Sequence, residues 1–125
     1  MNRRILVIDD NEDILFMLNA MLKLKGYKVT IKENAENIEN FIKEITPDII
    51  LMDMLLSGID GRDVCKRLKA NPFFSQIPLI MISAHPQAKE KCLEAGVDFF
   101  LAKPFEMNDL FQTVSNALSL NRTSS

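Results

Sequence analysis

The sequence lacks the long uniform runs that mark membrane proteins and nucleic-acid-binding proteins. No apolar run approaches the roughly 20 residues that a membrane-spanning helix needs, and the start, Met1 to Arg4, leads into a short strand rather than a signal-peptide core. The 15 Lys and Arg residues and 17 Asp and Glu residues give a formal charge of -2, and neither sign forms a long block. We therefore expect a cytoplasmic protein that contacts neither membranes nor nucleic acid directly.

Cysteine is also scarce, and its placement argues against redox or metal chemistry. Cys65 and Cys92 are the two cysteines, and neither belongs to a CxxC pair or to a metal-type spacing. Both lie in segments with helical periodicity, where a buried, reduced thiol is the usual state. We predict no chemical role for either thiol.

Short apolar runs alternate with segments of helical period along the chain. Its 125 residues, 47% of them hydrophobic, suit one domain with a substantial core, which we place at residues 1–120 with a polar tail at 121–125. The alternation predicts βαβ units, and therefore an α/β fold with a five-stranded parallel sheet. The predicted strands are 4–8, 29–31, 49–52, 79–82 and 99–102.

The third predicted strand differs from the others because it is apolar at every position. Residues Ile49 to Met52 show no polar alternation, which indicates that helices cover both faces of this strand. We therefore predict that it lies at the centre of the sheet, and that Asp53 follows it at the middle of the sheet's carboxyl edge.

Helix signals fill the segments between the predicted strands. The first helix begins near Asn11, Asn34 caps the second and Pro47 stops it, and three more helices are expected near 61–70, 86–95 and 108–118. The apolar stripe of the first helix contains Ile14, Met17, Leu18, Met21 and Leu22.

Two apolar residues of the first helix fall outside this stripe. The helical period puts Phe16 nearly opposite the stripe and Leu15 at its margin, near the carboxyl edge of the sheet. An exposed aromatic side chain there suggests a docking surface for a protein partner. A single exposed apolar residue is also common and needs no function, so both interpretations stay open.

Polar residues follow four of the five predicted strands. Asp9 and Asp10 follow the first strand, Asp53 the third, Ser83 the fourth and Lys103 the fifth. Because the carboxyl ends of parallel strands line one crevice, we expect these side chains to converge. Each alone is a common cap or turn residue. Together they form a candidate site for a metal ion and a phosphoryl group.

The acidic residues of this site would repel one another without a cation. Two like charges ~4 Å apart cost about 4 kcal/mol at an effective dielectric constant of about 20. Mg²⁺ suits the site because it prefers oxygen ligands, often one or two carboxylates and a substrate phosphate. With Mg²⁺, the Lys103 ammonium and the Ser83 hydroxyl in place, Asp53 is a candidate nucleophile toward phosphorus.

From Arg4 to Leu118 the chain resembles the receiver domain of bacterial two-component response regulators. The matching motifs are Asp9-Asp10, Asp53, Asp60-Gly61, Ser83-Ala84 and Lys103-Pro104-Phe105. The resemblance implies a doubly wound (βα)5 fold with the flavodoxin-like strand order 2-1-3-4-5. It also implies a signalling domain rather than an enzyme, one that catalyses only its own phosphorylation and slow dephosphorylation.

The resemblance further implies a role for each acidic residue. Asp53 would be the phosphoacceptor, and Asp10 and Asp53 would bind Mg²⁺, with Mn²⁺ as an alternative ion. The backbone carbonyl of Leu55 would complete the metal's ligands, and Asp9 would act through water.

The remaining implied roles concern the phosphoryl group, the switch and the partners. Ser83 and Lys103 would contact the phosphoryl group, Ser83 and Phe100 would move together after phosphorylation, and the Lys103–Pro104 bond would be cis. A histidine kinase or histidine phosphotransfer protein would donate the phosphoryl group, with Leu15 and Phe16 as its candidate contacts. An output partner would bind the surface of the fourth helix, fifth strand and fifth helix.

The chain departs from the family pattern beside the acceptor. Ser57, followed by Gly58, stands where the family most often has proline, which predicts a more mobile loop. Leu55 and His85 occupy positions that tune the access of water to the phosphoryl group. Because an apolar Leu55 cannot orient a water, we predict a long-lived phosphoryl form.

Three other functions are alternatives to this one. An aspartate-nucleophile phosphatase would carry two aspartates spaced two residues apart after the first strand, whereas Asp9 and Asp10 are adjacent. A flavin phosphate needs a loop rich in Gly, Ser or Thr, and the acidic segment 9–13 would repel it. A receiver-like interaction module that is never phosphorylated remains the alternative, although it has no physical reason to keep so repulsive a cluster.

Overall fold

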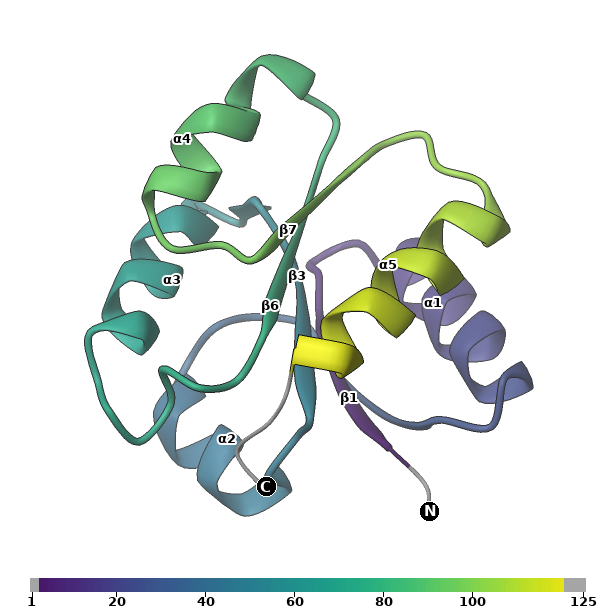
Figure 1. Ribbon diagram of the computed structural model, residues 1–125, viewed down its shortest axis with the longest axis horizontal. Helices are drawn as coiled ribbons and strands as arrows, with labels where there is room; N and C mark the ends of the chain where they lie inside the picture. Colours follow the sequence, from purple (N-terminus) through teal and green to yellow (C-terminus); the bar gives the residue numbers. More distant parts are fainter. Residues whose placement is uncertain (1–2, 121–125) are drawn as a thin grey trace.

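A five-stranded parallel sheet forms the centre of the computed structural model, which describes residues 3–120 (Figure 1). The strands run in the order β2-β1-β3-β6-β7. The predicted order is confirmed, because β6 and β7 are the fourth and fifth strands of the expected series. Their bounds are β1 Arg4–Ile8, β2 Lys28–Lys32, β3 Ile49–Asp53, β6 Leu79–Ser83 and β7 Phe99–Ala102.

Strand β3 lies at the centre of the sheet, as its composition predicted. It pairs with β1 on one side and β6 on the other, and every residue from Ile49 to Met52 is buried. Ile49 and Leu51 face one apolar cluster, and Ile50 and Met52 face the other. The strand is therefore apolar throughout because side chains from both of its faces enter a core.

Helices cover both faces of the sheet. Figure 1 shows α1 (Glu12–Leu24) and α5 (Met107–Leu120) on one side, and α2 (Ile38–Ile45), α3 (Gly61–Lys69) and α4 (Lys89–Glu94) on the other. This is the doubly wound arrangement expected from the sequence. Within residues 3–120, no helix combines the length and the apolar character that crossing a membrane requires.

The prediction for Leu15 is wrong. Its side chain is 3% exposed and packs with Leu18, Leu22, Leu110 and Val114 between α1, the sheet and α5. The buried face of α1 is centred on Leu15, Leu18 and Leu22, so Leu15 cannot belong to an exposed docking surface. Phe16, at 76% exposed, does face outward.

Two helix boundaries also differ from the prediction. The α2 helix begins after Asn37, whereas the Asn34 side chain accepts a hydrogen bond from the Glu36 amide and so forms a turn upstream of the helix. The predicted fourth helix is divided into a 3-10 turn over Pro86–Ala88, followed by α4. The tail at 121–125 lies outside the described residues.

The two cysteines are buried and free. Burial raises the pKa of the Cys65 thiol to about 11, and it raises the pKa of Cys92 as well. Thiols held protonated in this way are poor nucleophiles and poor metal ligands.

A short hairpin follows β3 and forms one wall of the candidate site. Strands β4 (Leu55–Leu56) and β5 (Ile59–Asp60) pair antiparallel and are joined by a two-residue turn. The turn residues Ser57 and Gly58 have φ angles of 36° and 82°. Two successive positive φ angles are typical of the tight hairpin turn that matches strand twist, and glycine adopts such an angle without strain.

Candidate functional site

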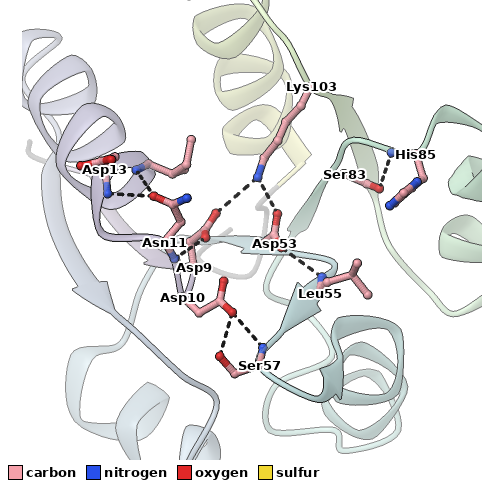
Figure 2. Close-up of polar contacts among 11 residues, drawn as sticks. Asp9, Asp10, Asn11, Asp13, Asp53, Leu55, Ser57, Ser83, His85 and Lys103 are labelled. Carbon is pink, nitrogen blue, oxygen red and sulfur yellow. Dashed lines mark hydrogen bonds and ion pairs between the residues drawn. The ribbon is translucent and has the colours of Figure 1, made fainter.

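The carboxyl ends of four strands bring the predicted polar residues together. Asp9 follows β1, Asp53 and Ser83 end β3 and β6, and Lys103 follows β7. One oxygen from each of Asp9, Asp10 and Asp53 lies within 4.8 Å of the other two. Figure 2 shows the Lys103 side chain extending toward Asp9 and Asp53. The expected convergence at one edge of the sheet is therefore present.

Lys103 is the cation of the inner part of the pocket. Its Nζ lies 2.9 Å from Asp53 Oδ1 and 3.8 Å from Asp9 Oδ2. Asp53 Oδ2 accepts a hydrogen bond of 3.0 Å from the Leu55 amide, so both oxygens of the candidate acceptor are held. Among the described residues, the Lys103 ammonium is the one cation paired with this group of three carboxylates, which leaves the pocket with excess negative charge.

Asp9 is the least accessible of the three carboxylates. It is 1% exposed, and its Oδ1 accepts a hydrogen bond of 2.9 Å from the Asn11 amide. Asp9 Oδ2 is buried without a hydrogen-bond partner in the part of the chain that the structure describes, because Lys103 Nζ is too distant to donate well. Burial raises the pKa of Asp9, and the charge of Asp53 raises it further.

Asp10 has the opposite environment. It is exposed, and its Oδ2 accepts two hydrogen bonds from Ser57, 2.9 Å from the amide and 2.8 Å from Oγ (Figure 2). The Ser57 hydroxyl lowers the pKa of Asp10 and so favours the ionised carboxylate. Sequence reasoning missed this contact, although a Ser-Gly pair is a signal for a turn.

Helix caps are supplied by other residues than the acidic pair. Asn11 accepts hydrogen bonds from the Asp13 and Ile14 amides and caps α1, which leaves Asp10 free of the capping role. Asp60 caps α3 through the Arg62 amide and also pairs with the Arg62 side chain at 2.7 Å. Asp60 therefore has a structural role at the far end of the hairpin.

A small pocket of about 180 Å³ opens beside Asp53 and Lys103. Ser83 lies in its wall, is 2% exposed, and accepts a hydrogen bond of 2.9 Å on Oγ from the His85 amide. The exposed His85 and the 53% exposed Leu55 also line this pocket. Its volume and its position next to the Asp53 carboxylate suit a group the size of phosphate.

The donor set fits a hard divalent cation. Carboxylate oxygens are the ligands that Mg²⁺ prefers, and Asp9, Asp10 and Asp53 present them close together. Asp9 Oδ2 is a second indication, because a buried oxygen that has no hydrogen-bond donor within residues 3–120 is stabilised by a cation or by an ordered water. These residues are able to hold a metal ion.

The remaining predicted residues lie around this centre. Phe100, on β7, is half-buried and packs against the cluster that includes α4. The Lys103–Pro104 peptide bond is cis, and the Lys103 amide donates to the Ser83 carbonyl at 2.8 Å. Phe16 is exposed on the first half of α1, in the helix that begins directly after Asp10 and Asn11.

Comparison with known proteins identifies the family. A model of the response regulator receiver domain matches residues 5–115. This chain belongs to that family. It is a receiver domain of the two-component response regulators, as the strand-end motifs predicted, and thus a signalling domain.

Full-length response regulators are among its relatives. The chain is 32% identical over 123 residues to the DNA-binding response regulator MtrA of Mycobacterium tuberculosis strain H37Rv, and covers 53% of that protein. It is 34% identical over 110 residues to the phosphate regulon transcriptional regulatory protein PhoB of Pseudomonas aeruginosa, and covers 48% of it. These alignments include 97% and 86% of this chain, which therefore spans about half the length of these relatives.

Solved receiver structures have the same fold. A putative response regulator from Chloroflexus aurantiacus superimposes with a TM-score of 0.89 at 34% identity, over 95% of this receiver domain and 99% of that chain. The receiver domain of the sensor histidine kinase PA1611 from P. aeruginosa, solved with a magnesium ion in its active-site cleft, gives 0.84 at 28% identity, with the same coverage of 95% and 99%.

Proposed function

We propose that this receiver domain accepts a phosphoryl group on Asp53, with Mg²⁺ as cofactor, and thereby changes a protein-interaction surface. The observation that carries the proposal is the pocket's charge arrangement. Lys103 Nζ contacts Asp53 and approaches the buried Asp9 Oδ2, which no group among the described residues hydrogen-bonds, inside a group of three carboxylates. Such an arrangement suits a bound cation and an incoming anionic group.

The transfer needs few protein groups. An Asp53 carboxylate oxygen attacks phosphorus, the bond from phosphorus to the donor's nitrogen or oxygen breaks, and the donor leaves with that electron pair. Asp10, Asp53 and the Leu55 carbonyl would hold Mg²⁺, with Asp9 acting through water. When bound, the ion neutralises charge that develops on the phosphoryl oxygens.

Lys103 and Ser83 would stabilise the product. The Lys103 ammonium is already 2.9 Å from Asp53 Oδ1, so a short movement of its flexible side chain would bring it to a phosphoryl oxygen. The Ser83 hydroxyl lines the same pocket and can donate to another oxygen. A phosphoryl group adds about -1.5 to -2 charges, which these donors and the metal would balance.

The switch would follow from the movement of Ser83. Ser83 and Phe100 lie on the adjacent strands β6 and β7, beneath the surface formed by α4, β7 and α5. The two helices of this surface carry exposed apolar side chains, with Leu93 on α4 44% exposed and Met107 on α5 45% exposed. A downstream protein that prefers one shape of this surface would shift the equilibrium between the two shapes.

The proposed phosphodonor is a histidine kinase or a histidine phosphotransfer protein, with Phe16 as a contact. A cytoplasmic location is part of this proposal, and so is the absence of direct binding to nucleic acid by this domain. The domain would catalyse only its own phosphorylation and dephosphorylation.

Intact mass spectrometry tests the acceptor. The native chain, incubated with acetyl phosphate and Mg²⁺, should gain the mass of one phosphoryl group, and Asp53→Asn should gain none. A chelator added in place of Mg²⁺ should suppress the gain in the native chain. Equal phosphorylation of both proteins would place the acceptor elsewhere, and a native chain that is never modified would favour the unphosphorylated interaction module.

A further inference from the structure

Ser57 makes a contact with Asp10 that has no role in the proposed phosphoryl transfer. The Ser57 amide and hydroxyl both donate to Asp10 Oδ2, at 2.9 and 2.8 Å, although the two residues are 47 positions apart. Both donors use the same oxygen, so neither occupies Oδ1. Figure 2 shows the Ser57 side chain and amide converging on that single oxygen.

The hairpin holds Ser57 in this position. Leu55 pairs with Asp60 and Leu56 with Ile59, which fixes the two-residue turn. At the far end of the hairpin, the Gly61 amide donates to the Met54 carbonyl, and a Cβ on Gly61 would lie only 2.8 Å from the Asp53 carbonyl oxygen. The hairpin therefore holds Ser57 in a fixed position relative to the backbone of Asp53.

The conformation of the turn is incompatible with the proline that the family most often has here. Ser57 has a φ of 36°, which a proline ring, fixed near about -65°, cannot adopt. Proline would also supply neither the amide nor the hydroxyl that reaches Asp10. The contact is therefore a property of this chain's Ser57-Gly58 turn.

We infer that Ser57 is a positioning residue that orients the Asp10 carboxylate for Mg²⁺ and so increases the affinity for the ion. The inference rests on the proposed function, in which Asp10 is a metal ligand. Asp10 is exposed and would otherwise sample several side-chain rotamers. Two donors on Oδ2 hold one orientation before the ion arrives, which reduces the entropy lost on binding.

The opposite effect is the alternative outcome, because hydrogen-bond donors also compete with a metal for oxygen lone pairs. Competition would require Mg²⁺ to use Oδ2, the oxygen that already has two donors. Mg²⁺ needs only one oxygen from a carboxylate, and Oδ1 takes part in neither of the two bonds. Carboxylate ligands of protein metal sites are commonly hydrogen-bonded by neighbouring groups, whose loss weakens metal binding.

Titration calorimetry with MgCl₂ tests the inference on the whole chain. Ser57→Ala and Ser57→Gly both remove the hydroxyl, and they should weaken Mg²⁺ binding about tenfold, the lower end of the loss expected when a metal ligand loses a hydrogen-bonding neighbour. The two variants differ in their effect on the turn, because glycine relieves the strain of the positive φ and alanine does not. Equal weakening in both therefore points to the hydroxyl rather than to the backbone.

Three controls separate the possible results. Ser115→Ala removes an exposed serine hydroxyl on α5 and should leave Mg²⁺ affinity unchanged. The melting temperature without Mg²⁺ reports any loss of fold. With acetyl phosphate as donor, the Mg²⁺ concentration that gives half the maximal rate should rise by the same factor as the dissociation constant.

The outcomes are distinguishable. Unchanged or tighter Mg²⁺ binding in both Ser57 variants, with a native chain that does bind the ion, would overturn the role of Ser57 and leave the proposed function intact. A native chain that shows no Mg²⁺ binding would overturn the metal site, and the role of Ser57 with it.

Discussion

Asp9 and Asp10 are adjacent in the sequence, yet their surroundings are opposite. Asp9 points inward, is 1% exposed, and has an oxygen without a hydrogen-bond partner among the described residues. Asp10 points outward and accepts two hydrogen bonds from Ser57. The pKa of Asp9 is raised by burial, whereas the pKa of Asp10 is lowered by the Ser57 hydroxyl.

The difference shows that one acidic pair can supply two kinds of carboxylate. The inner one is destabilised in its charged form, and its partial compensation is Lys103, 3.8 Å away. The outer one is stabilised in its charged form by neutral donors from the hairpin. A divalent cation would therefore relieve the inner carboxylate, and the outer carboxylate is ready to bind it.

Removing Lys103 should produce the largest effect, because it is the cation of the inner side. Lys103→Met should slow phosphorylation by acetyl phosphate at least about 100-fold, the usual cost of losing a preorganised charge next to a reacting group. Mg²⁺ affinity should change in the opposite direction and increase, because a competing cation is gone. Mass spectrometry of samples quenched at successive times measures the phosphorylation rate, and titration calorimetry measures the Mg²⁺ affinity.

Lys28→Met is the matched control for that experiment. Lys28 is an exposed lysine at the start of β2, at the opposite end of the strands, so its loss removes one charge without touching the pocket. Phosphorylation of Lys103→Met at the native rate would refute the role of the ammonium.

Neutralising the inner carboxylate should stabilise the metal-free domain. Asp9→Asn should raise the free energy of unfolding by about 1 kcal/mol at neutral pH, a few degrees in melting temperature, because it removes a buried charge next to Asp53. Folding raises the pKa of Asp9 above 3.8, the ordinary value that applies in the unfolded chain. The stability of the native protein therefore falls as the pH rises from 3.8 to the pKa of the folded state. The advantage of Asp9→Asn should therefore be small near pH 3.8 and grow above it.

Thermal melts across pH, with and without Mg²⁺, measure this effect. Saturating Mg²⁺ should shrink the advantage of Asp9→Asn, because the ion stabilises the native carboxylates. Asp13→Asn, which neutralises an exposed acid in the first turn of α1, should instead lower stability slightly. A lower melting temperature for metal-free Asp9→Asn would contradict the charge argument.

The inner side of the pocket, formed by Asp9, Asp53, Ser83 and Lys103, was predictable from the sequence. Most of the outer side, formed by Asp10 and the β4–β5 hairpin, was not. Asp53, Ser83 and Lys103 follow apolar runs, and parallel strands bring such residues to one edge of the sheet independently of the conformations of the loops. The contact between Ser57 and Asp10 depends instead on the φ angles of a two-residue turn, and no periodicity reports these. The sequence suggested only a mobile loop there.

The errors in the helices have a similar origin. The α1 helix has apolar residues at eight of nine positions from Ile14 to Leu22, so the centre of its buried face depends on where β1 and α5 lie. The helical period alone therefore puts Leu15 at the margin of the stripe, whereas the packing puts it at the centre. Asn34 and Asn37 are both good capping types, and composition alone cannot choose between them.

Leu55, at the base of the hairpin, provides a smaller test of the outer side. Its side chain is 53% exposed beside the pocket and offers nothing to orient a water molecule. We predict that the phosphoryl group persists for minutes or longer, and that Leu55→Gln shortens its lifetime several-fold by positioning a water. Mass spectra recorded after removal of acetyl phosphate give the decay.

Ile59→Gln is the control for Leu55→Gln, because it places the same polar group on the opposite strand of the hairpin, at a residue 43% exposed. It should leave the decay unchanged. Loss of the phosphoryl group from the native chain within seconds would show that water reaches the site without help from this position.

The smallest expected effect concerns Phe16, which tests whether the outer side extends to a protein surface on α1. Phe16→Asp should slow phosphoryl transfer from a histidine phosphotransfer protein a few-fold, since it puts a charge into a desolvated contact, and should spare transfer from acetyl phosphate. Leu24→Asp is a close control, because Leu24 is 78% exposed on the same helix, compared with 76% for Phe16, but lies at its other end. Comparable slowing with both donors would mean that Phe16 affects the pocket rather than docking, and no slowing with either would leave Phe16 an ordinary exposed side chain.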